Sequence, residues 1–395
     1  MRLTTENRME LEKIYGKRRV EENWKRYQEV TLEFKKRYGS DKDCFYFSAP
    51  GRTEIGGNHT DHNAGLVLAA SINLDFVAAA APNQSQYVNI VSKGYEQTIQ
   101  IDLEELRCDG SYQGTQELVK GILDGFLQFG YEMGGFDAYV SSNVISSAGV
   151  SSSASLEMLI CCMVNTFFNN GTVPIEVYAK IGQHGENKYW RKKSGMLDQL
   201  SCAVGGTVFI DFANQTFPII KKLDFVFSHM GCRLMIVNTG KGHGDLSEEY
   251  SSIPEEMAKV ARIFGKQYLR EVPYEEVLQN ICKIRNIVGD RALLRTIHYY
   301  EDNRRVQAQV QAIEKGNYEE MLMLINESGN SSWKGLQNCI LRENILEQPI
   351  ALSLTLTELF IKKIGKGACR VHGGGFAGVI MAVIPEEYCD EYLNY

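Results

Sequence analysis

The chain has 395 residues, of which 44% are hydrophobic, and a formal net charge of −7 at pH 7. This length and apolar content predict two lobes or one large domain with a substantial core, while the acidic balance argues against a general nucleic-acid binder. Apolar runs are too short for a membrane span, and the ten scattered cysteines form no Cys-x-x-Cys pair. We therefore expect no zinc site and no disulfide framework, but reduced thiols in a cytoplasmic protein.

Apolar periodicity and capping signals predict an alternation of helices and strands. The first 27 residues have the pattern of a mixed-charge amphipathic helix and lack the apolar core of a signal peptide. Strands and helices alternate without regular βαβ spacing, which indicates an α+β fold with a lobe boundary near 210–235. The predicted strands are 45–48, 66–70, 75–81, 87–92, 97–102, 136–142, 206–211, 233–238, 368–372 and 378–384. The predicted helices are 116–129, 155–169, one capped by Thr172, 254–270, 274–284, 300–326 and 350–363.

A polar cluster lies between two apolar segments near the N-terminus. Residues 51–65, GRTEIGGNHTDHNAG, place Arg52, His59 and Asp61 between predicted strands. A surface turn needs glycine and asparagine, but it does not need these three side chains. The cluster therefore predicts a functional loop.

Two loops of small residues are candidates for close approach to a ligand. Residues 146–155, SSAGVSSSAS, precede an apolar helix, where unpaired backbone N–H groups and the helix dipole favour phosphate. This is not a Walker A sequence, and taken alone the loop is better explained as a serine-rich turn with an ordinary N-cap. Residues 372–378, HGGGFAG, place three consecutive glycines after a strand. They suit a close backbone approach or simply a flexible hairpin.

Two acidic residues lie on apolar faces. On the helix capped by Thr172, with Pro174 in its first turn, the inward positions include Ile175 and Gly182, and Glu186 continues that face. A buried carboxylate needs a partner, and a metal ion or a nearby lysine would each serve. Asp198 lies in SGMLDQLSCAVGG and could be a general base, an N-cap or a structural hydrogen-bond acceptor.

These pieces occur in the order seen in the GHMP kinases, and the chain resembles the galactokinases among them. Residues 49–65, APGRTEIGGNHTDHNAG, are similar to the motif A-P-G-R-V-N-L-I-G-E-H-T-D-Y-N-x-G. Residues 149–157 resemble G-L-S-S-S-A-S-L-E, and residues 185–187 with 195–199 resemble A-E-H/N followed by G-I-M-D-Q. Residues 373–378 resemble G-G-G-F-G-G.

The resemblance implies an ATP-dependent sugar 1-kinase with an α+β, two-lobed GHMP kinase fold and its site in the cleft between the lobes. The expected domains are an N-terminal helical extension, 1–40, an N-terminal lobe, 41–215, and a C-terminal lobe, 216–395. Asp198 would take the proton from the anomeric hydroxyl, and Arg52 would keep Asp198 ionised and stabilise the transferred phosphoryl group. The implied sugar contacts are Asn58, His59, Asp61, Gly195 and Tyr250. The implied ATP contacts are Gly149, Ser151, Ser152, Ser153 and Ala154, and the implied Mg²⁺ ligands are Ser153 and Glu186.

Departures from the motifs concentrate on substrate recognition. The family's glutamate, which resembles a contact to the C6 hydroxyl, is Asn58, and its tyrosine is His62. Asparagine carries no charge, so a C6 carboxylate would meet less repulsion. Plant galacturonate kinases also lack that glutamate and have this histidine. The tryptophan that packs on adenine in this family aligns with Thr115, for which Tyr112 could substitute.

Three functions follow from these residues. The first is a galactose 1-kinase, and the second is a 1-kinase for galacturonate or N-acetylgalactosamine. The third is a sugar-sensing regulator without catalysis, but such relatives are expected to lack the pair Ser153-Ala154, which is intact here. We expect ATP and Mg²⁺ as cofactors, no nucleic-acid or membrane partner, and a monomer in the cytoplasm.

Overall fold

The computed structural model describes residues 4–395 except 96, 109, 111–113, 146–148, 193, 241–246 and 342–343. Tyr112 and the first three residues of the serine-rich loop thus lie outside the described residues. The chain forms two compact units, and each draws on several stretches. Unit 1 comprises Met1–Arg52, Ser71–Ile145 and Ser151–Val204, and unit 2 comprises Thr53–Ala70, Ser146–Val150 and Gly205–Tyr395. The lobe boundaries after residues 40 and 215 stay a prediction.

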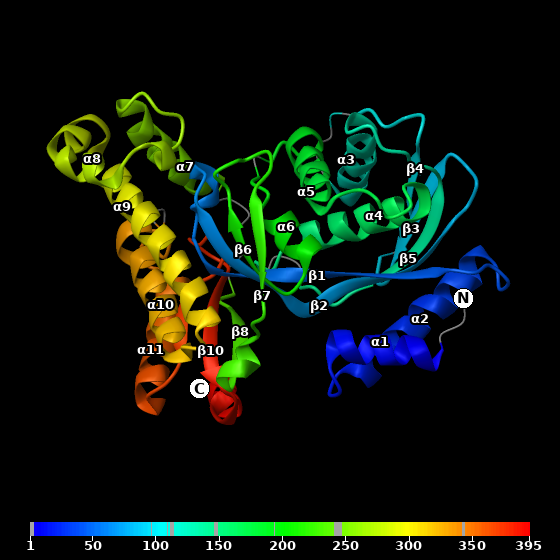
Figure 1. Ribbon diagram of the computed structural model, residues 1–395. Helices are drawn as coiled ribbons and strands as arrows, with labels where there is room; N and C mark the ends of the chain where they lie inside the picture. Colours follow the sequence, from blue (N-terminus) through cyan, green and yellow to red (C-terminus); the bar gives the residue numbers. More distant parts are fainter. Residues whose placement is uncertain are drawn as a thin grey trace. The chain divides into compact units, whose positions relative to one another are not determined.

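Unit 1 is a sheet with helices on both faces (Figure 1). The second half of strand β2 pairs antiparallel with β5, which pairs parallel with β3, and β3 pairs antiparallel with β4. Alternate side chains of β2 point to opposite faces, and Val77, Ala79 and Ala81 join the core formed with α1 and α2. Helices α3 to α6 cover the other face in Figure 1. The elements are α1 Thr5–Tyr15, α2 Val20–Tyr38, β1 Phe45–Gly56, β2 Leu66–Pro82, β3 Tyr87–Ser92, β4 Ile99–Asp102, α3 Gly114–Gln128, β5 Phe136–Ser142, α4 Ser152–Phe168, α5 Ile175–His184, the π-helix Gly185–Tyr189 and α6 Leu197–Val204.

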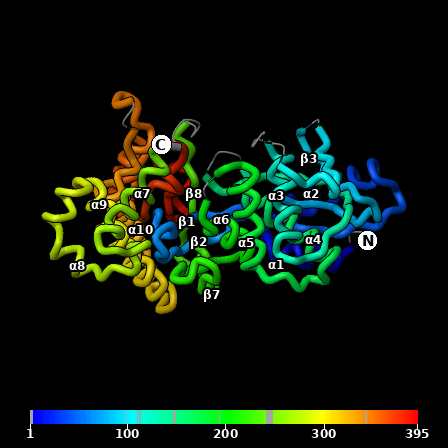
Figure 2. The backbone as a smooth tube through the Cα atoms, turned by 90° about the horizontal axis from the view of Figure 1, so that it is seen from above, coloured from blue at the N-terminus to red at the C-terminus, as the bar shows by residue number. Residues whose placement is uncertain are grey.

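Unit 2 combines long helices with two groups of strands. The first half of β2 pairs with β6, which pairs with β7, and a separate sheet has the order β8-β10-β9. In Figure 2, α7, α9 and α10 lie around β8 and the C-terminus. Val306 and Val310 of α9 share a core with Leu66 and Leu68 of β2. The elements are a 3₁₀ helix Asp61–Asn63, β6 Thr207–Asp211, β7 Ile219–Leu223, β8 Cys232–Asn238, α7 Ser247–Ile263, α8 Tyr274–Gln279, α9 Ile281–Glu314, α10 Tyr318–Ser331, α11 Pro349–Ile364, β9 Ala368–Val371, β10 Val379–Pro385 and α12 Cys389–Asn394.

Most predicted elements are present, and the differences have local causes. The single helix predicted over 300–326 is wrong, because α9 ends before Gly316, whose φ of 65° is incompatible with a right-handed helix. Thr172 does not cap α5, since Pro174 occupies the N-cap and the Thr172 hydroxyl donates to Asn169 instead. Ile175, predicted to face inward, is 39% exposed. Strand β1 continues into the first polar motif and ends at Gly56, so Arg52 lies in a strand rather than a loop.

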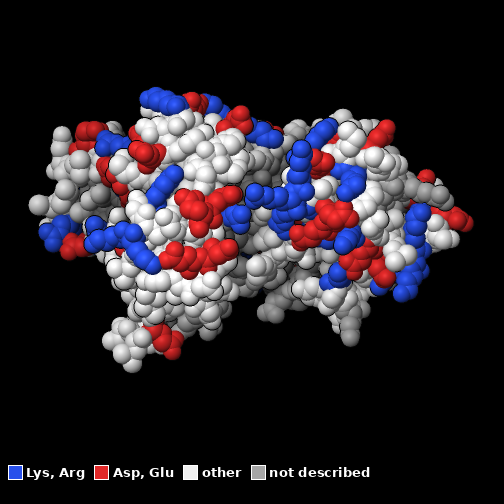
Figure 3. Space-filling model, turned by 90° about the horizontal axis from the view of Figure 1, so that it is seen from below, with Lys and Arg blue, Asp and Glu red and all other residues white. Residues whose placement is uncertain are grey.

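The surface drawn in Figure 3 carries Lys and Arg side chains interspersed with Asp and Glu. Mixed charge of this kind gives no extended field of one sign on that face. Among the described residues, no helix combines the length and the hydropathy that crossing a membrane requires.

Candidate active site

The catalytic pair predicted from sequence, Arg52 and Asp198, is in direct contact in unit 1. Arg52 Nε and one of its terminal nitrogens both lie 2.8 Å from Asp198 Oδ1. Ser151 Oγ donates to Asp198 Oδ2 at 2.6 Å. Burial alone would raise the pKa of Asp198, but the charge and hydrogen bonds of Arg52, together with Ser151, lower it to about 2. Asp198 is therefore a carboxylate at neutral pH, and its side chain remains 33% exposed.

Ser151 begins the helix that follows the serine-rich loop, and its geometry is unusual. Its φ of 58° lies in the left-handed region, which is uncommon for a residue other than glycine. Its hydroxyl donates to Asp198 and does not cap α4. The first N–H groups of a helix have no intrahelical acceptor, so the start of α4, with Ser152, Ser153 and the buried Ala154, offers donors beside Asp198.

Glu186, the predicted metal ligand, lies in a π-helix turn that continues α5. Such turns are rare and frequently occur at functional sites. The Glu186 side chain is only 2% exposed, and its Oε1 accepts hydrogen bonds from Ser153 Oγ at 3.3 Å and Lys192 Nζ at 2.6 Å. Of the two partners left open by the sequence, the structure shows the lysine, Lys192, and a metal ion held by Ser153 and Glu186 stays a prediction. Among the described residues, no group of three or more His, Cys, Asp or Glu side chains is arranged to hold a metal ion.

A second buried carboxylate, Glu157, was missed by the sequence analysis. It is fully buried on α4, and Gln199 Nε2 donates to its Oε2 at 3.0 Å and to Glu186 Oε2 at 3.3 Å. Burial, reinforced by the charge of Glu186, raises the pKa of Glu157 well above its ordinary value. This shift favours the protonated form of Glu157, and its contact with Gln199 links Glu157 to Glu186. The apolar run SLEMLICCMV that contains Glu157 was the available signal.

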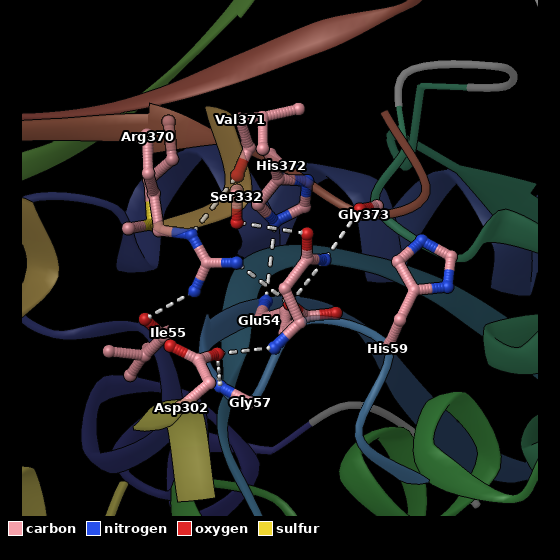
Figure 4. Close-up of polar contacts among 12 residues, drawn as sticks. Glu54, Ile55, Gly57, His59, Asp302, Ser332, Arg370, Val371, His372 and Gly373 are labelled. Carbon is pink, nitrogen blue, oxygen red and sulfur yellow. Dashed lines mark hydrogen bonds and ion pairs between the residues drawn. The ribbon is translucent and has the colours of Figure 1, made fainter. Parts of the chain in front are cut away.

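In unit 2, Asn58 is the centre of a buried hydrogen-bond network. Its partners Glu54, Ser332 and Gly373 are labelled in Figure 4. Its Nδ2 donates to Glu54 Oε1 at 2.9 Å and to the carbonyl oxygen of Gly373 at 2.8 Å. Its Oδ1 accepts from Asn338 Nδ2 at 2.9 Å and from Ser332 Oγ at 3.3 Å. An asparagine amide has two donors and two acceptor positions, so the protein itself uses all four. This geometry favours a supporting role for Asn58 over contact with a ligand.

The charge of Glu54 is balanced within the same network. A terminal nitrogen of Arg370 lies 3.1 Å from Glu54 Oε1, the oxygen that also accepts from Asn58. Arg370 is fully buried and also donates to the carbonyl oxygens of Ile55 and Val371, as the dashed lines in Figure 4 show. Buried charges persist when paired and hydrogen-bonded in this way.

His59 and Tyr250 meet the glycine-rich loop. His59 Nε2 lies 3.0 Å from the Gly374 carbonyl oxygen, and Tyr250 Oη donates to the Gly375 carbonyl oxygen at 3.2 Å. Desolvation, with the neighbouring His62, lowers the pKa of His59 to about 3, so the imidazole is neutral. With its Nε2–H on the carbonyl, His59 keeps Nδ1 as an acceptor. A Cβ on Gly374 would lie 1.6 Å from the Tyr250 ring, so only glycine fits.

The remaining predicted residues are placed as follows. Asp61 starts the 3₁₀ helix, and its carboxylate lies 3.7 Å from His62 Nε2, whose ring stacks near that of His59. Gly149 has a φ of 67°, and a Cβ there would lie 2.8 Å from Val379 at the end of the glycine-rich loop. Gly195 lies, partly exposed, in the segment leading into α6.

Comparisons with known proteins match two regions of this chain to known families. Residues 32–82 match the galactokinase galactose-binding signature, and residues 117–206 match the GHMP kinase N-terminal domain. A curated galactokinase from Clostridium tetani is 26% identical over 92% of this chain and 89% of its own length. The two matched regions contain Arg52, Asn58 and Asp61 in the first and Ser153, Glu186 and Asp198 in the second.

Solved structures confirm the predicted fold. The structure of Lactococcus lactis galactokinase complexed with galactose superposes with a TM-score of 0.79 and 24% identity, covering 93% of this chain and 92% of that one. Methanococcus jannaschii mevalonate kinase gives a TM-score of 0.62 and 15% identity, covering 90% and 95%. At these identities the structures establish the GHMP kinase fold alone, and the location of the site between two lobes stays a prediction. The family matches and the curated relative show that this chain contains a GHMP kinase N-terminal domain and a galactokinase galactose-binding signature.

Proposed function

We propose that this protein transfers the γ-phosphoryl group of ATP to the C1 hydroxyl of galactose and forms galactose 1-phosphate. One observation carries the proposal: an ionised Asp198 is held by Arg52 and Ser151 at the start of α4. In this proposal Asp198 is the base, Arg52 is the fixed cation, and the N–H groups at the start of α4 bind phosphate. Phosphoryl transfer requires this combination of positioning and charge stabilisation and little covalent chemistry.

Asp198 is the proposed acceptor of the proton of the C1 hydroxyl. A carboxylate with a pKa of about 2 is a weak base, so it accepts the proton as bond formation to phosphorus makes the hydroxyl more acidic. Arg52 fixes one carboxylate oxygen and keeps the group ionised. Its delocalised positive charge also stabilises negative charge on the transferred phosphoryl group.

Ser153 and Glu186 are the proposed Mg²⁺ ligands. Both supply oxygen, the atom that Mg²⁺ prefers, and Ser153 Oγ already lies 3.3 Å from Glu186 Oε1. When bound, the ion would neutralise charge on the β- and γ-phosphates. Gln199 holds the second oxygen of Glu186, so the carboxylate is oriented before any ligand arrives.

The residues proposed to bind the sugar are His59, Asp61, Gly195 and Tyr250. The His59 Nδ1 acceptor and the Asp61 carboxylate suit sugar hydroxyls, and an aromatic ring such as that of Tyr250 suits an apolar sugar face. Asn58, whose loss of charge suggested a uronic acid, directs its amide into the protein, and Glu54 keeps a carboxylate in the same network. Galactose is therefore favoured over galacturonate. A monomeric state and a cytoplasmic location stay predictions.

The test is ADP release from Mg-ATP in the presence of galactose, galacturonate, N-acetylgalactosamine and glucose. We expect the highest kcat/KM with galactose and a product whose phosphate is on C1 by ³¹P NMR. Asp198→Asn is the matched inactive control. A higher kcat/KM with galacturonate would make galacturonate the proposed substrate in place of galactose. No ADP release with any of the four sugars, together with measurable galactose binding, would support a sensor.

A further inference from the structure

Lys192 is hydrogen-bonded to Glu186 through both its side chain and its backbone N–H. Its Nζ lies 2.6 Å from Glu186 Oε1, and its N–H donates to the Glu186 carbonyl oxygen at 3.0 Å. Arg191 has a φ of 52°, in the left-handed region, and this turn brings the chain back over Glu186. The ammonium group at the end of a lysine side chain is ordinarily mobile, but that of Lys192 has a fixed partner.

The two partners differ in exposure. The Glu186 side chain is 2% exposed, whereas that of Lys192 is 52% exposed. The ammonium group therefore approaches a buried carboxylate from the solvent side. The Lys192 ammonium group can leave Glu186 and enter water at small cost in free energy. The Glu186 carboxylate stays in place, because it is buried and its second oxygen accepts a hydrogen bond from Gln199.

A lysine side chain is a cation at neutral pH, and the buried Glu186 carboxylate, 2.6 Å from Lys192 Nζ, is its anionic partner. Arg52 is already bound to Asp198. Lys192 is thus the cation that balances Glu186.

The oxygen that Lys192 binds is also the one that faces Ser153. Glu186 Oε1 accepts from both Lys192 Nζ and Ser153 Oγ. A divalent ion ligated by Ser153 and Glu186 would have to approach this same oxygen, and an ammonium group 2.6 Å from that oxygen would repel it. Lys192 and the ion therefore compete for one site.

We propose that Lys192 is an internal competitor of the divalent cation, which makes cation binding depend on nucleotide. Phosphate oxygens would give the released ammonium group new charge-assisted partners while completing the ligand set of the ion. Lys192 thus disfavours entry of the free ion and favours entry of the ion with its nucleotide. This inference rests on the proposed function, because it takes Glu186 as the metal ligand.

The experiment is a Mn²⁺ titration of the nucleotide-free, full-length protein, in which electron paramagnetic resonance measures free Mn²⁺. The variants are Lys192→Met, Lys192→Gln and Lys192→Arg. The matched control is Lys188→Met, because Lys188 is 50% exposed and lies 2.7 Å from another carboxylate, that of Asp124. Each protein is also titrated with saturating ADP, and thermal unfolding checks its fold.

We expect Lys192→Met and Lys192→Gln to bind Mn²⁺ about tenfold more tightly than the unmodified protein, a typical size for coupling between linked sites. Lys192→Arg and Lys188→Met should match the unmodified protein, ADP should reduce the gain, and adding Glu186→Gln to Lys192→Met should abolish it. Unchanged Mn²⁺ affinity in both neutral variants, or a gain that survives Glu186→Gln, would overturn the inference.

The outcome is separable from that of the sugar panel. If galactose is phosphorylated but the neutral variants bind Mn²⁺ as the unmodified protein does, only the competition is wrong. If the panel is silent but the Lys192 variants gain affinity through Glu186, the competition holds and the proposed function fails.

Discussion

Replacing Asn58 by glutamate distinguishes a structural role of this position from a role in sugar recognition. Asn58 Nδ2 lies 2.9 Å from Glu54 Oε1, so the substitution places two buried carboxylates in contact. At 4 Å and an effective dielectric constant of about 20, two like charges repel by about 4 kcal/mol. The donor to the Gly373 carbonyl oxygen is also lost, at about 1 kcal/mol. Because Arg370 can share part of the added charge, we expect a loss of about 3–5 kcal/mol in the free energy of unfolding.

A double-mutant cycle makes this prediction sharp. Glu54→Gln alone removes the carboxylate that Arg370 contacts at 3.1 Å, which should cost about 3–5 kcal/mol for a buried ion pair. The double variant Glu54→Gln/Asn58→Glu again has one amide and one carboxylate in contact. The motif that the chain resembles has asparagine at position 54 and glutamate at position 58, the same two residue types in exchanged order. We therefore expect the double variant to recover most of the lost stability, with a coupling of at least about 3 kcal/mol.

The assay is urea unfolding at pH 7, followed by circular dichroism, on all four proteins of the cycle. ADP release with galactose and galacturonate is measured on each protein that remains folded. The reasoning is refuted if Asn58→Glu unfolds within about 1 kcal/mol of the unmodified protein, or if the effects of the two single changes simply add. A change of sugar preference without a change in stability would indicate that Asn58 contacts the sugar.

Four further predictions concern Asp198, Glu157 and Gly182. Asp198→Asn should abolish turnover while galactose binding, measured by calorimetry, persists, and retained turnover would exclude Asp198 as the base. The pKa of Asp198 is lowered to about 2. The ionised carboxylate should therefore stabilise the fold above the ordinary carboxyl pKa of about 4, and this stabilisation should be lost as pH falls through about 2. Acid-unfolding curves of Asp198→Asn should lack this loss. The pKa of Glu157 is raised, so the unmodified protein should lose stability as pH rises above the ordinary glutamate value. Glu157→Gln should remove that slope, and equal slopes in the two proteins would contradict the raised pKa. Gly182→Ala should destabilise by about 1–3 kcal/mol in urea unfolding, because its Cβ would lie 2.5 Å from Glu157 Oε2, whereas helix propensity alone predicts a gain of about 1 kcal/mol.

Much of the fold was predictable because it depends on local pattern. Strands 87–92 and 136–142 match the structure at both ends, since apolar alternation and flanking turn residues define them. The break between α9 and α10 was missed, although Gly316 marks it, because the apolar pattern of the two helices runs on across the break. The short strand Ile219–Leu223 was also missed, since its side chains are largely exposed and it forms by pairing with β6.

The candidate site was predictable only in part. The argument that a glutamate on an apolar face needs a partner identified Glu186, and the same argument applied to α4 would have identified Glu157. Lys192 carried no such signal, because surface lysines are common and its sequence neighbours are also basic. The role of Asn58 was inferred from a motif position, and its four hydrogen bonds come from residues distant in sequence.

The sequence by itself determined the α+β class, most helices and strands, and the residues proposed to carry the chemistry, since these follow from periodicity, residue type and motif order. The tertiary structure decided which atoms those residues bind. Arg52 and Asp198 are 146 residues apart, and Asn58 and Asn338 are 280 apart. Hydrogen bonds and ion pairs act over about 3 Å, so such partners are set by the packing of distant segments. That packing directs Asn58 into the protein and Lys192 onto Glu186.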